Sequence, residues 1–547
     1  MLLHYMLTGV VAAPLVWAAP IFSRSTSDAP AVRTSYGHVL GSVSEYRDGV
    51  SVFKGIPYAA PPTGSSRWTP PTQPEAWTGV YNATTFGPQC PQTLDMGTGL
   101  WTTGSSVMSE DCLYVNIWTP NFNSSEVEKL PVYMWMHGGR FVDGSGDVIT
   151  YDGSGLASQG VVVVTFNYRL GPFGYFAHPD LSAESPHNSS GNYGVMDMIA
   201  AVQWVKSEIS YFGGDSNRIT VGGQSSGSSC ALDIMYSPLS SGMIAGVIAE
   251  SGARAPHDPM TGGLATSYRQ KDEAEASGVS VVASMNLSTI AEMRNLSMET
   301  LLTIDTLNAT IYVGTHFQNV SAFSEAPEWR PVMDGYVLPH TYGDSLRYNA
   351  HGNVPILTGN NLDESGASTS PGFTVETFKS NYTAMFGNLS SEFFELYPAN
   401  NDTQADDSSN ALFADISRVS TWRWAKDWYA GGAKNSVYSY FWTHSPPSQS
   451  LGAFHGSEMY YVFNNIPYNY PNMAWTDDDY AIQSTMVEYW VNFIKTGNPN
   501  GGNTTYWSPS GNDTTTMWLG DLFGAGTIGD EKRIKLVEKF FSVQQER

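Results

Sequence analysis

The stretch Arg218-Ile-Thr-Val-Gly-Gly-Gln-Ser225-Ser-Gly-Ser-Ser-Cys-Ala-Leu-Asp-Ile-Met235 decides the fold of this chain. Its first residues alternate as in a β-strand, and the residues after Gly227 contain neither Gly nor Pro until Pro238, as in a helix. Between the two lies the G-x-S-x-G pattern Gly223-Gln-Ser-Ser-Gly227. The sequence therefore predicts a strand, a tight turn and a helix, with the hydroxyl of Ser225 projecting from the turn.

Ser225 has two interpretations. Taken alone, the pattern also fits an ordinary surface turn, because G-x-S-x-G arises by chance on the order of once in every couple of chains of this composition. The flanking strand and helix favour a strained turn with glycines where any side chain would collide with a neighbouring element. We therefore take Ser225 as the candidate nucleophile.

Length and composition indicate a large α/β enzyme rather than a nucleic-acid-binding protein. The chain has 547 residues, enough for three or four domains of the usual size, a soft expectation that large α/β enzymes exceed. Acidic residues outnumber basic ones 51 to 27, and the formal charge of −24 disfavours binding to nucleic acid or to an anionic membrane. The expected partner is a small molecule, and the oligomeric state is left open.

The first 18 residues predict a secretory signal peptide. The mostly apolar run Met6–Trp17 precedes a cleavage site near Ala18. Only His4 and the free amino group supply positive charge, so a buried N-terminal segment is the alternative. No later stretch approaches ~18 uninterrupted apolar residues, and the tail Glu538–Arg547 carries neither a lipid-anchor nor an ER-retention signal. We expect a secreted, extracellular protein without a membrane anchor.

Twelve Asn-x-Ser/Thr sequons agree with export, because glycosylation of this motif belongs to the secretory pathway. Several are expected by chance in a chain rich in Asn, Ser and Thr. The candidate glycosylation sites are Asn82, Asn123, Asn188, Asn286, Asn295, Asn308, Asn319, Asn381, Asn388, Asn401, Asn503 and Asn512.

If two of the three cysteines form a disulfide, the third remains unpaired. A disulfide between Cys90 and Cys112, which enclose 21 residues rich in Gly, Ser and Thr, would contribute roughly 3 kcal/mol in the chain-entropy model. We interpret Cys230, on the helix after the elbow, as a buried and unreactive thiol. The chain has no Cys-x-x-Cys or His-Glu-x-x-His motif, so no metal site and no cofactor is predicted.

Strand-like and helix-like segments alternate along the chain. Short strands are expected over 39–56, and the strand 129–136 leads into His137-Gly-Gly-Arg-Phe141. The apolar run 160–166 is typical of a central strand covered on both faces, and 193–212 has a helical period. This alternation predicts an α/β fold with the elbow at the carboxyl end of a central strand, where such sheets bind ligands.

A Ser nucleophile needs a base, and the base needs an acid that fixes its tautomer. The strand 354–359 leads into a turn with Asp363 and Glu364, the most plausible acid-bearing turn. Downstream, His444 ends a strand-like segment, whereas His455 lies in a glycine-rich loop that could bend towards Ser225. Position alone favours His455 but leaves His444 open.

Nine motifs follow one another between residues 53 and 500: Phe53–Pro62, Ser109–Pro120, His137-Gly-Gly139, Asn167–Gly171, Phe212–Asp215, the Ser225 elbow, the Glu364 turn, Gly452–Gly456 and Lys495–Asn500. Together they resemble the type-B carboxylesterase/lipase family, which includes secreted fungal esterases, lipases, cholinesterases and inert neuroligin-like adhesion proteins. The resemblance implies an α/β-hydrolase fold, with a large mixed, mostly parallel sheet flanked by helices and a small N-terminal β-sheet. It also implies that residues 19–547 form one catalytic domain.

Carried over position by position, the resemblance implies a Ser225–His455–Glu364 triad, with Asp363 in a structural role. The implied oxyanion hole consists of the backbone N–H groups of Gly139, Arg140 and Ser226, each such donor typically worth roughly 3 kcal/mol in the transition state. Further implied features are the Cys90–Cys112 disulfide closing a lid-like loop over 90–112, an Arg67–Glu110 ion pair, and supporting roles for Gln224, Ser251 and Glu458.

Two positions depart from the family pattern, and a third residue, Trp101, bears on the choice of substrate. Arg140 replaces a glycine, and its side chain either lines the acyl site or, as we favour, points away and pairs with a surface acid. Gln224 replaces the Glu of many relatives, which weakens the case for a quaternary-ammonium substrate. Trp101 is one residue out of step with the choline-binding Trp of cholinesterases, and we interpret it as an exposed lid aromatic.

Three functions compete. A serine carboxylesterase acting on esters of small or medium organic acids, including those of a secondary metabolite, is favoured. An extracellular lipase acting on acylglycerols is the alternative, disfavoured by the modest size of the 90–112 loop. A non-catalytic adhesion or binding protein comes last, because such relatives lose the nucleophile whereas all three triad positions are intact here.

Overall fold

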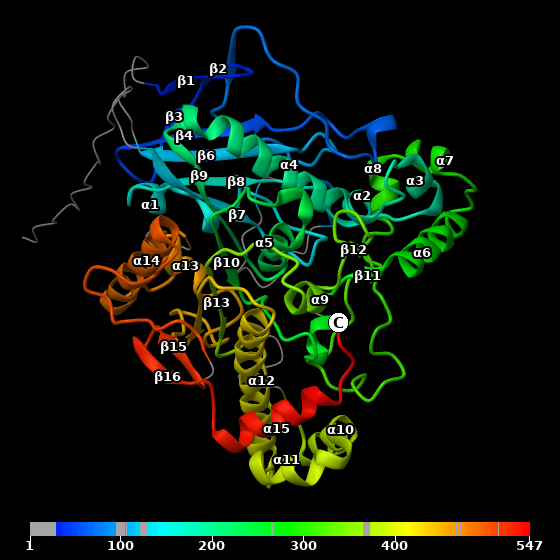
Figure 1. The fold of residues 1–547 in the computed structure, drawn as a ribbon, viewed down its shortest axis with the longest axis vertical. Coiled ribbons are helices and arrows are strands. Elements are labelled where there is room, and N and C mark those ends of the chain that lie inside the picture. Colours follow the sequence, from blue (N-terminus) through cyan, green and yellow to red (C-terminus); the bar gives the residue numbers. More distant parts are fainter. Residues whose placement is uncertain are drawn as a thin grey trace, which may run out of the picture.

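An 11-stranded mixed sheet forms the centre of the molecule, in the order β16-β15-β14-β13-β10-β9-β7-β8-β6-β4-β3 (Figure 1). All neighbours from β8 to β15 pair in parallel, whereas the pairs at both edges are antiparallel. The strands are β3 (Ser42–Val43), β4 (Val50–Pro57), β6 (Tyr114–Pro120), β7 (Leu130–Met136), β8 (Val162–Phe166), β9 (Gly214–Gln224), β10 (Gly246–Glu250), β13 (Ile356–Asn361), β14 (Val437–Trp442), β15 (Thr515–Leu519) and β16 (Gly524–Thr527).

Two smaller sheets lie outside the central one. Strands β1 (Ala31–Thr34), β2 (Gly37–Leu40) and β5 (Val80–Asn82) form a three-stranded sheet, and β11 (Arg269–Gln270) pairs with β12 (Val332–Met333). The predicted mixed, mostly parallel sheet and the small N-terminal sheet are both confirmed.

The computed structural model describes residues 29–93, 104, 107–120, 129–263, 267–364, 372–466, 468–469, 472–511 and 513–547. The predicted signal peptide, Trp101, most of the 90–112 loop, and the sequons Asn123 and Asn512 lie outside the described residues.

Side chains of the central strands alternate between two cores. On β7, Val132, Met134 and Met136 join the cluster that includes residues of α4 and α5, whereas Tyr133 and Trp135 join the cluster that includes residues of α13 and α14. Because successive residues of a strand point to opposite faces, the sheet is covered on both sides. A third cluster joins α10, α11, α12 and α15 at the end of the molecule opposite the β1–β2 hairpin (Figure 1).

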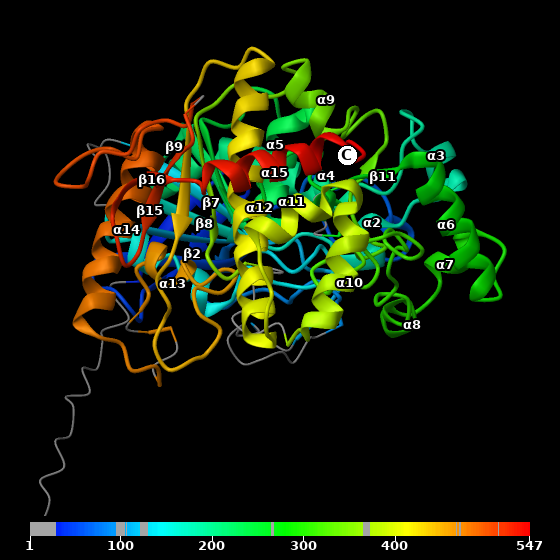
Figure 2. The same ribbon diagram turned by 90° about the horizontal axis from the view of Figure 1, so that it is seen from below.

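The helices lie between the strands along the chain, singly or in groups. Figure 2 shows the long helix α12 crossing close to α15. They are α1 (Ser154–Ala157), α2 (Gly171–Tyr175), α3 (Pro179–Glu184), α4 (Tyr193–Glu208), α5 (Ser226–Tyr236), α6 (Lys271–Ser284), α7 (Ile290–Arg294), α8 (Met298–Leu302), α9 (Tyr342–Arg347), α10 (Val375–Phe386), α11 (Ser390–Leu396), α12 (Asp402–Ala430), α13 (Met459–Val462), α14 (Asp477–Thr496) and α15 (Glu531–Ser542).

The helix predicted over 193–212 ends earlier than expected. Helix α4 ends at Glu208, and a 3-10 turn follows over Ile209–Phe212. This turn ends at Gly213, which caps it in a left-handed conformation with φ of 86°. The strands predicted over 129–136, 160–166 and 354–359 correspond to β7, β8 and β13.

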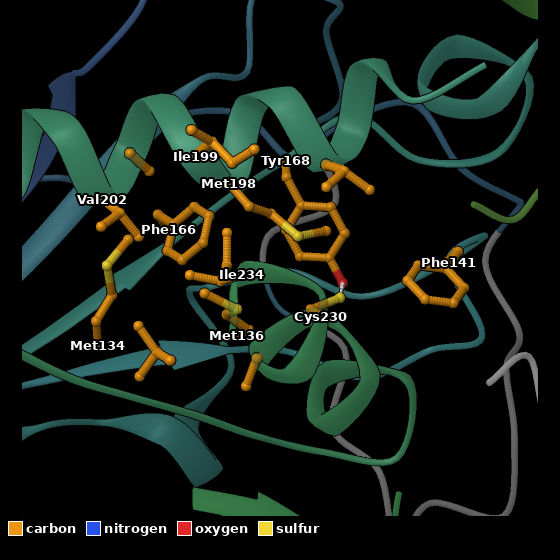
Figure 3. Close-up of a cluster of buried hydrophobic side chains, with 14 of the residues drawn as sticks. Met134, Met136, Phe141, Phe166, Tyr168, Met198, Ile199, Val202, Cys230 and Ile234 are labelled. Atoms are coloured by element: carbon orange, nitrogen blue, oxygen red, sulfur yellow. Dashed lines mark hydrogen bonds between the residues drawn. The ribbon is translucent and has the colours of Figure 1, made fainter. Parts of the chain in front are cut away.

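Cys230 is a free, buried thiol on α5, where it packs in the cluster shown in Figure 3. Its Sγ lies 3.6 Å from the hydroxyl of Tyr168, and burial raises the pKa of the thiol. The position agrees with the predicted structural role.

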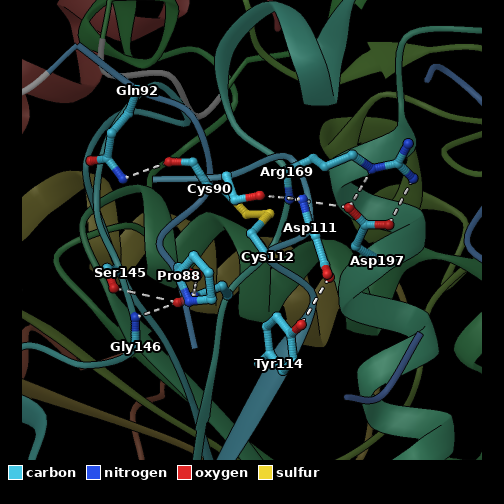
Figure 4. Close-up of a disulfide and its surroundings, with 12 residues drawn as sticks. Pro88, Cys90, Gln92, Asp111, Cys112, Tyr114, Ser145, Gly146, Arg169 and Asp197 are labelled. Atoms are coloured by element: carbon cyan, nitrogen blue, oxygen red, sulfur yellow. Dashed lines mark hydrogen bonds and ion pairs between the residues drawn. A yellow bond between two sulfur atoms is a disulfide. The ribbon is translucent and has the colours of Figure 1, made fainter. Parts of the chain in front are cut away.

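Cys90 and Cys112 form the disulfide that the resemblance implied (Figure 4). Two ion pairs of arginine with a carboxylate lie near this disulfide. Arg169 binds Asp197 with both residues buried, and Arg67 binds Glu110, as predicted. Arg67 also donates to the carbonyl of Leu296 at 2.9 Å, so it ties the loop after α7 to the disulfide region.

Among the described residues, no helix is both long and apolar enough to cross a membrane. Of the ten described sequons, nine have an exposed Asn, and Asn381 is partly buried and donates to the carbonyl of Asn319 at 2.9 Å.

Candidate active site

Ser225 occupies a sharp turn between β9 and α5. Its φ of 62° and ψ of −128° are strained for a non-glycine residue, and its N–H is held by the carbonyl of Glu250 at 2.9 Å. The flanking glycines are required by close contacts: a Cβ on Gly223 would lie 2.3 Å from the Gly227 carbonyl oxygen, and one on Gly227 would lie 2.1 Å from that of Met136. The elbow predicted from the sequence therefore has its expected geometry.

The loop after β7 lies against this elbow. Gly139, Arg140 and Phe141 all have left-handed φ values, of 111°, 56° and 66°. A Cβ on Gly138 would lie 3.3 Å from that of Ser225, which places the loop beside the nucleophile. Among the described residues, the N–H groups of Gly139 and Arg140 have no acceptor. Ser226 is the first residue of α5, a position whose N–H has no partner within the helix. These three donors remain free for an oxyanion.

Tyr168 supports this loop, a role that sequence reasoning missed. Its ring stacks on His137 with centroids 4.3 Å apart, and its hydroxyl donates to the His137 carbonyl at 2.7 Å. Burial lowers the pKa of His137 to about 4, so this imidazole is neutral and acts in packing. The Asn167–Gly171 motif contains Tyr168 and was the available signal.

His455 is bound to Glu364. Its Nδ1 lies 2.6 Å from Oε2 of Glu364, the residue that the family resemblance implied as the acid. A carboxylate can only accept, so Nδ1 carries the proton and Nε2 is left as an acceptor. Glu364 is almost fully buried, whereas 30% of the His455 side chain is exposed.

The pair is electrostatically coupled. Burial lowers the pKa of His455, but the charge and hydrogen bond of Glu364 outweigh it and raise that pKa above its usual value. Burial alone would raise the pKa of Glu364, but the charge of His455 and hydrogen bonds from His455, Ser251 and the Asn361 N–H hold it below its usual value. Glu364 is therefore ionised in the working pH range.

Gln224 binds the other nitrogen of the imidazole. Its Nε2 lies 3.0 Å from Nε2 of His455, and the Gln224 side chain is buried. In the described part of the chain the hydroxyl of Ser225 forms no hydrogen bond. The structure thus brings His455 to Glu364 and to the elbow, but the Ser225–His455 hydrogen bond that the sequence led us to expect is not formed.

A network of buried polar groups holds the acid turn. The Asn361 N–H donates to Glu364 Oε1 at 2.9 Å, and its side-chain amide donates to Glu458 Oε2 at 2.5 Å and to the carbonyl of Phe454 at 2.8 Å. Ser251, with φ of 58°, donates to Glu364 Oε1. Asn361 was missed because an Asn at a strand end has many roles.

Two further carboxyls lie buried behind this network. Glu250 accepts from the Trp490 indole at 2.8 Å, and Glu458 accepts from Asn361. Burial raises the pKa of both groups, that of Glu458 to about 7. The charge of Glu458 raises the pKa of Glu250 further, and the charge of Glu364 does the same for Glu458. The pair therefore holds a proton near neutral pH.

Asp363 lies on the same turn as Glu364 but points elsewhere. Its Oδ2 accepts the N–H of Ala453 at 2.8 Å, which fastens the loop of His455 to the acid turn. This contact matches the structural role that the resemblance implied.

The other candidate base, His444, is engaged away from the elbow. Its Nδ1 lies 2.5 Å from Asp521 and its Nε2 lies 3.0 Å from Asp479. Both nitrogens are occupied by carboxylates that join β14 to α14 and to the end of β15.

The Arg140 side chain points away from Ser225, as favoured, but not to a surface acid. Its guanidinium donates to the backbone carbonyl of Glu325 at 2.5 Å and the residue is exposed. The Glu325 carboxylate in turn accepts the N–H groups of Tyr312 and Val313 at 2.9 and 3.0 Å. Arg140 thus fastens the loop over 311–325 to the oxyanion loop.

Within the residues that the structure describes, no three His, Cys, Asp or Glu side chains are placed to hold a metal ion. The chemistry available at this site is that of an alcohol, an imidazole and a carboxylate, with backbone donors beside them.

Known proteins share this arrangement. The pattern that defines the carboxylesterase family matches residues 28–521. The chain is 35% identical over 496 residues to the fumonisin B1 esterase of Sphingopyxis macrogoltabida, covering 89% of this chain and 86% of that relative. It is 33% identical over 481 residues to the para-nitrobenzyl esterase of Bacillus subtilis (strain 168), covering 86% of this chain and 90% of the relative.

Solved structures agree. A PNB esterase structure superimposes with a TM-score of 0.74 at 29% identity, covering 93% of this chain and 99% of the other. A second, described as thermophilic, gives a TM-score of 0.73 over the same shares. The chain therefore belongs to the carboxylesterase family, has the α/β-hydrolase fold, and is a carboxylic ester hydrolase of the serine type.

Proposed function

We propose that this protein is a secreted esterase that cleaves esters of small or medium organic acids through an acyl-enzyme on Ser225, with His455 as base and Glu364 as acid. The observation that carries the proposal is the 2.6 Å contact between His455 Nδ1 and Glu364, because it leaves Nε2 free of a proton beside the elbow. The similarity to the fumonisin B1 esterase supports an ester-bearing secondary metabolite as substrate.

The reaction proceeds in two steps. In the first, Nε2 of His455 takes the Ser225 proton, and Oγ bonds to the carbonyl carbon while the negative oxygen enters the hole formed by Gly139, Arg140 and Ser226. The alcohol then leaves with the proton from Nε2. In the second, water gives its proton to Nε2, attacks the acyl carbon, and Ser225 leaves with that proton.

Glu364 keeps its charge throughout. It fixes the tautomer of His455 and stabilises the imidazolium that forms in both steps. The amide of Gln224 must move away from Nε2 before Ser225 can donate to it.

Export is supported by three features. The leader over 1–18 has the composition of a signal peptide, the Cys90–Cys112 disulfide suits an oxidising compartment, and the exposed sequons are available to glycosylation. Residues 19–547 would then form the mature catalytic domain.

The test is the Ser225→Ala variant with p-nitrophenyl acetate. We expect turnover to fall to the background rate while circular dichroism and melting temperature stay close to wild type. His455→Ala should give a similar loss. Turnover retained by a folded Ser225→Ala protein would assign the nucleophile elsewhere. A chain-length series with and without an oil interface separates esterase from lipase activity.

A further inference from the structure

Gln224 occupies the free acceptor of the catalytic imidazole. Its amide nitrogen lies 3.0 Å from Nε2 of His455, while Nδ1 of the same ring lies 2.6 Å from Glu364. A neutral imidazole with its proton on Nδ1 has a single acceptor, which is Nε2. The amide of Gln224 and the hydroxyl of Ser225 therefore compete for one atom, and in this structure the amide is bound to it.

The leaving alcohol has to reach the same nitrogen. In the first step of the reaction Nε2 of His455 gives its proton to the oxygen of the alcohol, so that oxygen must come within hydrogen-bonding distance of Nε2. The amide of Gln224 lies at this distance from Nε2 in the structure. The alcohol part of the ester therefore binds where the amide lies and has to displace it.

The displaced amide stays next to the alcohol. A Cβ on Gly138 would lie 3.3 Å from that of Ser225 and 3.7 Å from Oε1 of Gln224, so the loop after β7 lies against both side chains. The backbone of Gln224 is fixed at the end of β9, opposite Glu250 of β10, and the residue is only 4% exposed. The Gln224 side chain can therefore turn away from His455 without leaving the active site.

Displacement leaves the amide without hydrogen bonds. Among the described residues, Nε2 of Gln224 has His455 as its one partner, and Oε1 receives no hydrogen bond. A buried polar group that loses its partner destabilises the complex. An alkyl alcohol in this place excludes water and offers nothing in return. A second hydroxyl next to the ester oxygen can both accept from the amide nitrogen and donate to the amide oxygen.

We propose that Gln224 is a specificity-determining residue for the alcohol part of the ester, and that its amide binds a second hydroxyl beside the ester oxygen. The substrate class is then the monoesters of 1,2-diols and polyols. Binding of this hydroxyl draws the amide away from His455 and frees Nε2 for Ser225. A site that hydrogen-bonds a hydroxyl of its substrate rejects an analogue without one, because its own groups are then left unpaired. The inference rests on the proposed function.

The test compares two esters of one acid that differ only at the end of the alcohol: 2-hydroxyethyl butyrate, and propyl butyrate, in which a methyl group replaces the hydroxyl. Hydrolysis is followed by titration of the released acid at constant pH. Each kcat/KM is divided by the rate constant for hydrolysis of the same ester by hydroxide, which removes the difference in intrinsic reactivity. We expect wild type to prefer the hydroxyethyl ester by about tenfold in this corrected ratio, as for one buried polar group that keeps its partner.

Two variants test the assignment to Gln224. Gln224→Met keeps the length of the side chain and Gln224→Leu shortens it, and neither can bind the hydroxyl, so both should bring the corrected ratio close to one. Any effect of either variant on the protonation of His455 cancels in the ratio, because both esters use the same base. Gln483→Met is the matched control, since Gln483 is also buried but its Oε1 accepts the N–H of Ile466 at 3.1 Å, on α14. Its ratio should equal that of wild type.

A corrected ratio of one in wild type would overturn the inference, and this measurement needs no variant. A ratio as high as that of wild type in a folded Gln224→Met or Gln224→Leu protein would overturn the assignment to Gln224. Circular dichroism shows which variants are folded. Failure of the proposed function looks different, because neither ester would then be cleaved, or both would be cleaved by Ser225→Ala.

Discussion

The amide nitrogen of Gln224 lies 3.0 Å from Nε2 of His455, the nitrogen that has to take the proton of Ser225. A donor at this position stabilises the neutral imidazole, which accepts, over the imidazolium, which cannot. Gln224 therefore opposes the effect of Glu364, which raises the pKa of His455. The two neighbours of the imidazole act in opposite directions on its protonation.

Replacing Gln224 by Glu should move the pH profile of the enzyme. The new carboxylate would favour the imidazolium and raise the pKa of His455. Because only the neutral imidazole accepts the Ser225 proton, activity is lost as pH falls through this pKa. We expect the acidic limb of kcat/KM for a neutral ester to move up by about one pH unit.

Gln224→Met is the control for this variant, since it keeps the length of the side chain but has neither charge nor donor. Its acidic limb should move in the same direction by less. A Gln224→Glu profile that superimposes on wild type would show that the amide has no influence on His455.

Replacing Glu364 by Gln should reduce kcat by roughly 10⁴-fold with little change in fold, as expected when the tautomer of the base is no longer fixed. The matched control is Asp363→Asn, on the same turn, because an amide oxygen can still accept the Ala453 N–H. That variant should stay within a few-fold of wild type in an ester assay. Equal losses of kcat in both variants would contradict the assignment of Glu364 as the acid of the triad.

Replacing Arg140 by Gly should leave the order of preference among acyl chain lengths unchanged, because the side chain is bound to the Glu325 carbonyl and is exposed. The left-handed backbone at Arg140 costs a non-glycine residue about 1 kcal/mol, so the loss of the hydrogen bond is partly offset. The measurement is kcat/KM over a series of acyl chain lengths. A changed order of preference would show that the Arg140 side chain lines the acyl pocket.

Local sequence was sufficient where one segment determines its own geometry. The elbow at Ser225 was predictable because the strand, the glycines and the helix are contiguous, and the close contacts of Gly223 and Gly227 explain the pattern. The disulfide and the Glu364 turn came from the resemblance rather than from spacing.

Contacts between distant segments could not be predicted. The partner of Arg140 lies 185 residues away on an irregular loop, and the bond between Gln224 and His455 joins residues 231 apart. The periodicity of the sequence does not indicate which side chain reaches Nε2 of His455, because that contact depends on how two loops meet after the sheet has formed.

Replacing Cys230 by Ala should leave turnover nearly unchanged. The thiol is buried among apolar side chains, and its contact at 3.6 Å is with Tyr168 rather than with the triad (Figure 3). Loss of the buried sulfur should lower the free energy of unfolding by about 1 kcal/mol, as for an average core substitution. Activity and urea unfolding measured on one preparation separate the two effects, and a large loss of turnover in the folded variant would contradict the structural role.

Removing the disulfide should weaken both stability and activity. Closure of the loop between Cys90 and Cys112, 22 positions apart, is worth about 3 kcal/mol in the chain-entropy model, so the Cys90→Ala/Cys112→Ala variant should unfold at clearly lower urea concentration. Gln92, two residues from Cys90, exchanges hydrogen bonds of 2.8 and 2.9 Å with Gly144, just after the oxyanion loop. A looser Gln92 should therefore lower kcat several-fold. The control is Cys230→Ala, measured with and without a reductant. This variant keeps the Cys90–Cys112 disulfide until the reductant is added, so its stability and kcat should fall only after reduction. Unfolding curves of the double variant that match wild type would show that this bond constrains neither the unfolded chain nor the loop.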